Sequence, residues 1–243
     1  MNILEIKNLK KSFGGVHAVS GLDLAFTRGK LTSIIGPNGS GKTTLINILS
    51  GVHAMDGGTV AVASATLHAI NPQELPALGI TRTFQDVRLF EQMTVLDNIL
   101  VTLTARHPWK ALFERTSPAH HAKAEAVLKK VGLWEKRREL AYNLSYGQRK
   151  LLEIGRVLAM DADIILLDEP FAGLFKEMIR IIVGIIQELK AVGKTVLLIE
   201  HNMDLIRELS DHVVVMDAGR LLAEGKPDEV LARQDVIEAY LGE

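Results

Sequence analysis

The chain has 243 residues, of which 47% are hydrophobic and 23% are charged, a composition that predicts a folded globular protein rather than a disordered one. Its formal net charge of −1 gives no electrostatic basis for broad binding to nucleic acid. It has no cysteine, which excludes disulfides and thiolate metal sites. Neither a signal peptide nor a run of about 18 apolar residues is visible, so we expect a soluble chain whose membrane role would come through a partner.

The first part of the chain reads as strands. Residues 4–9 and 22–26 alternate apolar and polar side chains as half-buried strands do, with a Gly-Gly turn between them. Residues 31–35 form a short apolar run that is typical of a buried strand. This order predicts an antiparallel sheet that leads into a parallel one. Phe13 lies between the first two strands, where its ring would either pack in the core or stack on a nucleobase.

A glycine-rich loop follows the buried strand. Residues 36–44 read GPNGSGKTT, and the apolar residues of 45–49 recur at helical spacing as far as Gly51. This strand, loop and helix form the context that the G-x-x-x-x-G-K-[ST] phosphate loop requires. Its glycines let backbone N–H groups converge on phosphate oxygens, and the helix N-terminus adds partial positive charge. We therefore expect a bound nucleoside triphosphate rather than a glycine-rich turn that binds nothing.

Two side chains of this loop have predicted roles of their own. Lys42 would reach the β- and γ-phosphates as a point charge, and the Thr43 hydroxyl would be a ligand of Mg²⁺. The residues predicted to bind the nucleotide through this loop are Gly36, Pro37, Asn38, Gly39, Ser40, Gly41, Lys42, Thr43 and Thr44.

Strand signals end in the middle of the chain. The elements expected before that point are a strand within 57–62, a short helix at 72–78 and a strand at 80–84 that ends at Gln85. From about 86 to 160 helical patterning dominates, and we interpret this section as a helical insertion into an α/β core. Its expected features are an N-cap at Thr94, a loop-rich piece with Trp109 and Phe113 between Pro108 and Pro118, and an amphipathic helix at 122–131.

The α/β pattern returns in the last third of the chain. Its expected elements are buried strands at 164–167 and 195–199, helices at 178–189 and 203–209, a strand at 212–216 and a helical unit at 227–241.

Polar residues follow both buried strands, at the sheet edge where open α/β sheets bind ligands. Asp168 could hold Mg²⁺ through its water shell, and Glu169 could polarise the water that attacks the γ-phosphate. His201 follows the next strand and could hydrogen-bond the γ-phosphate. The alternatives are solvated acids and a histidine satisfied by the fold. The other seven histidines show no metal-ligand spacing.

Residues 144–148, LSYGQ, precede a helix expected from about 149 to 160. Ser145 is a natural N-cap, and Gly147 would leave room for an anion to approach the backbone N–H groups. Two interpretations stay open: an ordinary capped helix, or an anion site that serves a nucleotide held by another copy of the chain.

In combination these motifs resemble those of the ATP-binding-cassette (ABC) ATPases over nearly the whole chain. The matched motifs are Walker A at 36–44, Walker B and its following glutamate at 164–169, the Q-loop at Gln85, the signature motif (normally LSGGQ) at 144–148, the switch histidine at His201 and the adenine-stacking aromatic at Phe13. The resemblance implies that the chain binds ATP and Mg²⁺ and hydrolyses the ATP.

The resemblance also implies a fold and a set of roles. The fold would be α/β, with a P-loop NTPase core (a mixed sheet flanked by helices) and an antiparallel β subdomain formed by 1–85 and 161–243. Residues 86–160 would be an inserted α-helical signature subdomain. The implied catalytic residues are Glu169, His201 and Gln85, and the implied metal ligands are Thr43, Gln85 and Asp168.

Family members work as head-to-tail dimers, and the resemblance implies the same here. Each ATP would lie between one copy's Walker A loop and Ser145, Tyr146, Gly147 and Gln148 of the other. ATP would close this sandwich and hydrolysis would open it. The implied partners are two transmembrane permease subunits, a second copy or a sister ATPase, and indirectly a solute-binding protein, at the cytoplasmic face of the plasma membrane, with no nucleic acid.

A narrower resemblance is to the importer branch for branched-chain amino acids. It rests on RTFQ at 82–85, RLF at 88–90, MTVLDN at 93–98, LSYGQ at 144–148 and the ending VIEAYLGE at 236–243. The stretch around Trp109 fits the larger of the two ATPase subunits that such importers carry. The lipopolysaccharide-export and urea-import branches are alternatives, because their sequences are similar.

One departure from the branch raises a further alternative. Residues 172–176 read AGLFK where the branch usually has AGLNP, and a phenyl ring at Phe175 cannot supply the polar contact between the two nucleotide sites. This substitution raises the alternative that the chain is a regulatory subunit in which ATP hydrolysis is impaired. Another alternative is a soluble cassette ATPase acting on ribosomes or DNA, although such relatives have two cassettes or a long coiled-coil insertion. Tyr146, in place of the usual glycine, is familiar within the branch.

Overall fold

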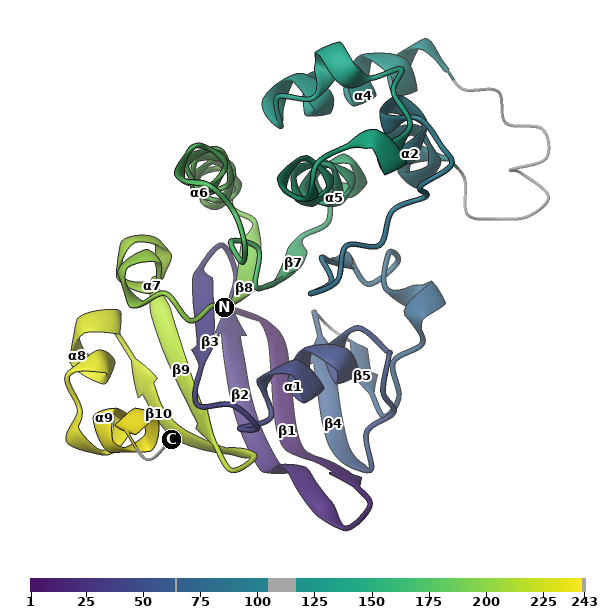
Figure 1. Cartoon of the computed structure of the whole chain (residues 1–243). Coiled ribbons are helices and arrows are strands. Elements are labelled where there is room, and N and C mark those ends of the chain that lie inside the picture. Colours follow the sequence, from purple (N-terminus) through teal and green to yellow (C-terminus); the bar gives the residue numbers. More distant parts are fainter. Residues whose placement is uncertain (64, 105–116, 242–243) are drawn as a thin grey trace. The chain divides into compact units, whose positions relative to one another are not determined.

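The computed structural model describes residues 1–63, 65–104 and 117–241 (Figure 1). Pro108, Trp109 and Phe113 lie outside the described residues, so the loop expected around them is not tested. The chain divides into two compact units. The first unit comprises Met1–Arg82, Asp163–Glu169 and Ile186–Glu243, and the second comprises Thr83–Ala162 and Pro170–Ile185.

The first unit contains an antiparallel sheet. Its strands are β1 (Asn2–Phe13), β2 (Val16–Thr27), β4 (Gly57–Val62) and β5 (Ala65–Leu67), in the order β2-β1-β4-β5. The alternation read over 4–9 is confirmed in β1 as far as Lys7, and it is interrupted at Asn8, which is also exposed, has φ 49° and lies at a shift in the pairing with β2. The short strand β5 was not predicted, because its three residues carry no periodic signal.

A second, six-stranded sheet lies in the order β10-β9-β3-β8-β7-β6. Its strands are β3 (Leu31–Ile35), β6 (Ile80–Arg82), β7 (Ile164–Asp168), β8 (Thr195–Ile199), β9 (His212–Asp217) and β10 (Arg220–Gly225). All pairs are parallel except β9–β10, so the sheet is mixed. Every residue of β3, β7 and β8 is buried, as continuous apolar runs in a parallel sheet require.

The helices of the first unit are α1 (Lys42–Leu49), α7 (Met203–Leu209), α8 (Pro227–Leu231) and α9 (Gln234–Leu241). Those of the second unit are α2 (Val95–Leu103), α4 (Pro118–Lys130) and α5 (Tyr146–Met160), and α6 (Lys176–Ala191) begins in the second unit and ends in the first. Thr94 caps α2 as predicted. Within the described residues no helix is both long and apolar enough to cross a membrane.

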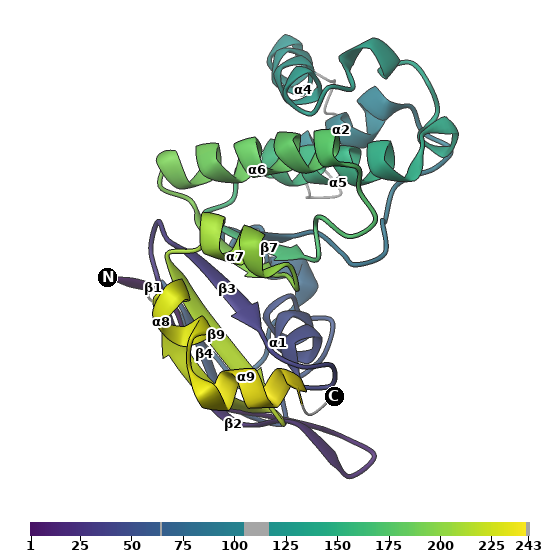
Figure 2. The same cartoon turned by 60° about the vertical axis from the view of Figure 1, so that its left-hand side comes forward.

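Two hydrophobic clusters form the core of the first unit. The larger includes Leu45 and Ile46 of α1 and apolar residues of both sheets. The smaller joins Ile35, Val213 and Val215 of the six-stranded sheet to residues of α7, α8 and α9. Neighbouring residues of β9 belong to different clusters because strand side chains alternate between faces. Figures 1 and 2 show α8 and α9 beside β9 and β10, the position that this smaller cluster stabilises.

Two expected elements are shorter than predicted. The helix at 72–78 is a 3-10 turn, Pro72–Glu74, because Pro76 has no N–H with which to continue it. The strand at 80–84 ends at Arg82, since the Phe84 N–H donates to the Glu153 carboxylate (3.0 Å) instead of to a neighbouring strand.

Three helices begin earlier than the sequence indicated, one of them α6, which begins at Lys176 instead of 178. The helix expected at 122–131 begins at Pro118, where the Ser117 hydroxyl accepts from the His120 N–H at 3.2 Å. Helix α5 begins at Tyr146 instead of near 149.

Candidate nucleotide-binding site

The loop between β3 and α1 has a backbone that only glycine fits. Gly36 has φ 145° and Gly41 has φ 102°, values that side-chain-bearing residues rarely adopt. A Cβ on Gly36 would lie 2.0 Å from the Met216 carbonyl oxygen, and one on Gly41 would lie 2.3 Å from that of Ala18. The sequence predicted the need for glycine here, but these close contacts with β9 and β2 come only from the structure.

Lys42, the first residue of α1, lies inside this loop. It is 6% exposed, and its ammonium donates to the carbonyl oxygens of Gly36 (2.7 Å) and Pro37 (2.8 Å). Asn38, Gly39 and Thr43 are exposed on the same loop and first turn. No acidic residue stands in the first turn of α1. The lysine charge, the N–H groups of the first helix turn and the exposed polar residues together make an anion-binding terminus.

The carboxylate at the end of β7 is paired with an arginine. Asp168 is 1% exposed, and its Oδ2 lies 3.1 Å from a guanidinium nitrogen of Arg82 at the end of β6. Arg82 also donates to the Asn47 side chain of α1 at 2.8 Å. The guanidinium therefore links β7 to the helix that follows the phosphate loop. Sequence reasoning missed this function of Arg82, because its partner is 86 residues away.

Glu169 and His201 meet at the ends of two neighbouring strands. Glu169 Oε1 lies 3.1 Å from His201 Nε2, and their side chains are 23% and 44% exposed. The parallel pairing of β7 with β8 brings them together, and the Glu169 N–H donates to the Ile199 carbonyl at 3.0 Å. Glu169 has φ 47°, a strained value of the kind that concentrates at functional sites. The sequence predicted both residues at this edge but not their direct contact.

A second carboxyl, that of Glu200, holds the backbone of the residues at His201. It is 7% exposed, and its Oε1 accepts from the N–H groups of His201 (3.0 Å) and Asn202 (3.2 Å). Burial raises the pKa of the Glu200 carboxyl, although the two backbone hydrogen bonds act in the opposite direction. Glu200 was not predicted as a site residue, although an acidic residue at the end of an otherwise apolar strand was an available signal.

Phe13, the last residue of β1, lies at the surface and not in the core. It is 42% exposed and meets the His53 ring edge-on at a centroid distance of 5.1 Å. The Lys11 ammonium lies 5.2 Å from the Phe13 centroid. An exposed aromatic face next to a histidine can stack on a planar base. His53 was assigned no function from the sequence.

In the second unit, LSYGQ begins α5 with a capping box. The Ser145 hydroxyl accepts from the Gln148 N–H (3.4 Å), and the Gln148 side chain accepts from the Ser145 N–H (3.1 Å). The N-cap prediction at Ser145 is confirmed. Tyr146 is half-exposed, and a Cβ on Gly173 would lie 3.2 Å from its ring.

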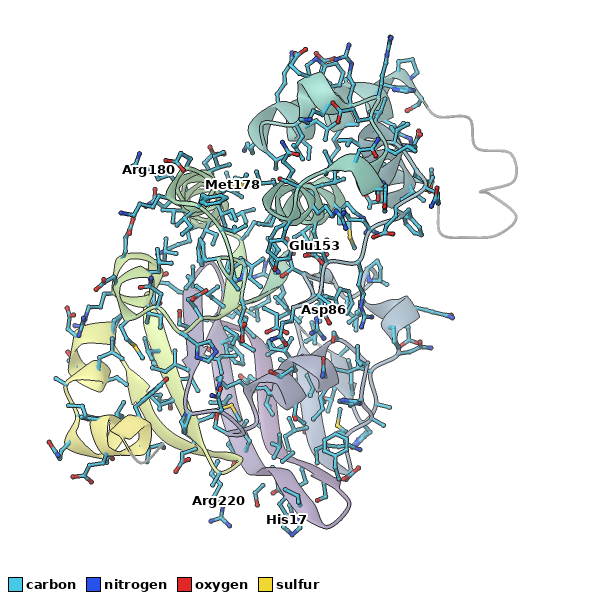
Figure 3. All side chains as sticks on the ribbon, in the orientation of Figure 1. His17, Asp86, Glu153, Met178, Arg180 and Arg220 are labelled. Atoms are coloured by element: carbon cyan, nitrogen blue, oxygen red, sulfur yellow. The ribbon has the colours of Figure 1, made fainter. Side chains whose placement is uncertain are left out.

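Gly147 packs closely against helix α6 on the side where a side chain would stand. Gly147 is buried, and a Cβ there would lie 2.2 Å from Met178 Sδ of α6 and 3.4 Å from Leu174 Cδ2. Figure 3 labels Met178 on α6. The prediction that an anion approaches the backbone N–H groups at this glycine concerns a different side of the residue and stays a prediction. The glycine is needed because α6 packs closely against α5.

Gln85 is exposed and belongs to the second unit, where α5 holds the backbone around it. Glu153 Oε1 accepts from the Phe84 N–H at 3.0 Å. The Lys150 ammonium donates to the carbonyl oxygens of Phe84 (3.2 Å) and Gln85 (3.3 Å). Figure 3 labels Glu153, which belongs to α5, and Asp86, which follows Gln85 in the chain.

A family model described as ABC transporter matches residues 19–172, which is more than half of the chain. The chain belongs to the ABC transporter family. A second model, described as branched-chain amino acid ATP-binding cassette transporter, matches residues 220–243. The chain is therefore an ATP-binding cassette, of a family that hydrolyses ATP to power transport.

Relatives and solved structures of ABC cassettes cover nearly the whole chain or all of it. LivG of Salmonella typhimurium, a high-affinity branched-chain amino acid transport ATP-binding protein, is 39% identical over 253 residues, covering 99% of this chain and 98% of LivG. The crystal structure of an ABC transporter cassette in its ADP conformation gives a TM-score of 0.87 at 38% identity, with 100% of both chains covered. A dimeric cassette in a post-hydrolysis state, bound to ADP and Pi, gives 0.81 at 25% identity, covering 92% of this chain and 98% of that chain.

Proposed function

We propose that this ABC cassette is the ATP-hydrolysing subunit of an importer for branched-chain or related amino acids. The observation that carries the proposal is the similarity to LivG over nearly the full length of both chains. The family match at 220–243 favours this branch over lipopolysaccharide export and urea import. A soluble cassette that acts on ribosomes or DNA is disfavoured by the net charge of −1.

The phosphate loop binds ATP in this proposal. Its N–H groups and the start of α1 receive the phosphates, and Lys42 neutralises the β- and γ-phosphates. Phe13 stacks on the base. The nucleotide-binding residues are those predicted from the sequence: Phe13, Gly36, Pro37, Asn38, Gly39, Ser40, Gly41, Lys42, Thr43 and Thr44.

Glu169 orients and polarises the water that attacks the γ-phosphate. Two observations support this assignment. Glu169 contacts His201 at 3.1 Å, and Glu200 accepts hydrogen bonds from the backbone N–H groups at 201 and 202. These contacts hold the Glu169 carboxylate and the histidine in fixed positions. His201 contacts the γ-phosphate and registers its loss. Gln85, in the second unit, is assigned to the attacking water and the metal on sequence grounds alone.

Magnesium is the second proposed cofactor, and the oxygen donors of this chain fit it. Among the described residues no group of three or more histidine or acidic side chains gathers into a metal cage. Mg²⁺ does not need one, because it keeps several waters and takes phosphate oxygens from the nucleotide. The Thr43 hydroxyl and the Asp168 carboxylate are the protein oxygens that would hold it, with Gln85 as a further ligand.

The proposed working state is a head-to-tail dimer. A dimeric cassette structure with a TM-score of 0.81 supports it. Ser145, Tyr146, Gly147 and Gln148 of one copy then complete the ATP site of the other. Two permease subunits would hold this dimer at the cytoplasmic face of the membrane, with 86–160 as the helical subdomain that transmits the motion. A solute-binding protein would deliver the cargo.

A pull-down tests the proposed assembly. We expect the tagged chain, recovered from detergent-solubilised membranes of its source cell, to bring with it two multi-spanning subunits and a second cassette. Mass spectrometry identifies them, and untagged cells processed in the same way are the control. Recovery of ribosomal or DNA-repair proteins instead of membrane subunits would contradict the importer proposal.

A further inference from the structure

The C-terminal helix α9 contacts the phosphate loop through one side chain. The Gly36 N–H donates to the Tyr240 hydroxyl at 2.6 Å, although the two residues are 204 positions apart in the chain. Figure 2 shows α9 ending next to the loop between β3 and α1. Tyr240 lies within residues 220–243, for which the sequence analysis had no mechanistic function.

This contact acts on a residue of the loop that has little conformational freedom. Gly36 is buried, and its α-carbon faces the Met216 carbonyl so closely that a Cβ would lie 2.0 Å away. Its carbonyl oxygen accepts from the Lys42 ammonium at 2.7 Å. The Gly36 N–H is thus hydrogen-bonded to Tyr240, and the Gly36 carbonyl is hydrogen-bonded to Lys42. The orientation of this residue therefore also sets where the lysine charge lies.

Apolar packing holds the ring of Tyr240 in the position from which its hydroxyl contacts Gly36. Tyr240 packs against the cluster that contains Ile35, Val215 and Val236, so α9 is attached to the strand that leads into the loop. The hydroxyl is the only polar atom of a side chain whose ring lies on apolar residues. An apolar cavity of about 200 Å³ borders the ring on the side of α7 and α8.

We propose that Tyr240 is a positioning residue of the phosphate loop, through which the C-terminal segment sets the affinity of the cassette for ATP. The hydroxyl holds Gly36 in the one orientation in which Lys42 and the loop amides can receive phosphates together. Without it the loop samples other orientations, and the apparent affinity falls in proportion to the fraction that is competent. This inference rests on the proposed function of the loop as the ATP site.

The experiment is Tyr240→Phe in the full chain, which removes one oxygen and keeps the ring. We expect MANT-ATP with Mg²⁺ to bind about three- to tenfold more weakly, and the Gly36 amide to exchange with solvent about tenfold faster by NMR. The unfolding midpoint should stay near that of the wild type. Tyr142→Phe is the matched control, because Tyr142 is 61% exposed in the second unit and its substitution should change neither quantity.

Two further variants separate the possible outcomes. Val236→Ala loosens the packing of α9 and should lower the unfolding midpoint, which is the effect a merely structural tyrosine would have. If Tyr240→Phe lowers only the midpoint and keeps wild-type ATP affinity and Gly36 exchange, the proposal is overturned. Lys42→Ala should bind MANT-ATP far more weakly than the wild type. Equal binding by Lys42→Ala would refute the ATP site itself, while the exchange of Gly36 would still report on Tyr240.

Discussion

One buried carboxyl next to the candidate site, that of Glu200, makes the stability of the folded chain depend on pH. Glu200 is 7% exposed, and burial raises its pKa above the ordinary value of 4.5, with the nearby Glu169 charge acting in the same direction. The folded chain therefore holds a proton at Glu200 more readily than the unfolded chain does. The stability that this proton supplies is fully present below pH 4.5 and is lost as the pH rises through the folded pKa.

Glu200→Gln should remove this dependence, because the amide oxygen can still accept from the backbone at 201 and 202 while carrying no charge. We expect the variant to gain stability relative to the wild type as the pH rises from 4.5 towards 8. Urea unfolding at a series of pH values measures the difference. Glu208→Gln, at an exposed position of α7, is the control. A difference between Glu200→Gln and the wild type that does not change with pH would contradict the argument.

At the scale of elements, α5 carries two functions at once. Its N-terminus presents the LSYGQ residues, and its buried face holds the segment that begins at Phe84. Lys150 Nζ lies 3.9 Å from Glu153 Oε2, and the two side chains are 0% and 5% exposed. Burial raises the pKa of Glu153, and its second oxygen has no hydrogen-bond partner among the described residues. Removing one member of such a pair leaves the other charge buried without its opposite charge.

Glu153→Ala should therefore destabilise the chain by about 1–3 kcal/mol, because the Phe84 N–H loses its acceptor and Lys150 loses a neighbouring charge. Glu153→Gln keeps an acceptor and should cost less. Urea unfolding measures both variants. The control is Glu125→Ala, which breaks an exposed pair with Lys129 (2.7 Å) and should cost less than about 1 kcal/mol. Equal stability of Glu153→Ala and Glu125→Ala would show that the buried pair does not anchor this segment.

For the whole molecule the question is whether ATP drives two copies together and is then hydrolysed. Phe175 is 76% exposed in the second unit, where the branch usually has a polar residue. If it impaired the connection between two sites, the chain would bind ATP without turning it over. The position of Glu169, in contact with His201, favours an active enzyme.

Glu169→Gln should keep ATP binding and lower the hydrolysis rate by about a hundredfold or more, because an amide cannot act as a base. With ATP and Mg²⁺ this variant should elute as a dimer in size-exclusion chromatography. Glu177→Gln, an exposed position in the first turn of α6, should hydrolyse ATP like the wild type. A wild-type rate no higher than that of Glu169→Gln would favour the regulatory alternative that Phe175 motivates.

Local patterns in the sequence were sufficient for most of the elements and for the choice of candidate residues. The apolar runs at β3 and β8 were predicted with the bounds that the structure has. Ser145 and Thr94 were predicted as N-caps because capping depends on residues within one turn. The phosphate loop was found because its glycines, lysine and threonine are contiguous. Each of these signals lies within a few residues of the chain.

Only the tertiary structure decided which of these residues meet and what surrounds them. Arg82 pairs with Asp168 across 86 positions, and Gly36 bonds to Tyr240 across 204. A side chain at Gly147 would meet Met178 of α6, a packing requirement that the sequence did not indicate. Such contacts leave no periodic trace in the sequence, since they depend on the order of strands in the sheet and on how helices pack. The sequence by itself determined the chemistry available at the strand ends, and the fold decided the geometry in which it is held.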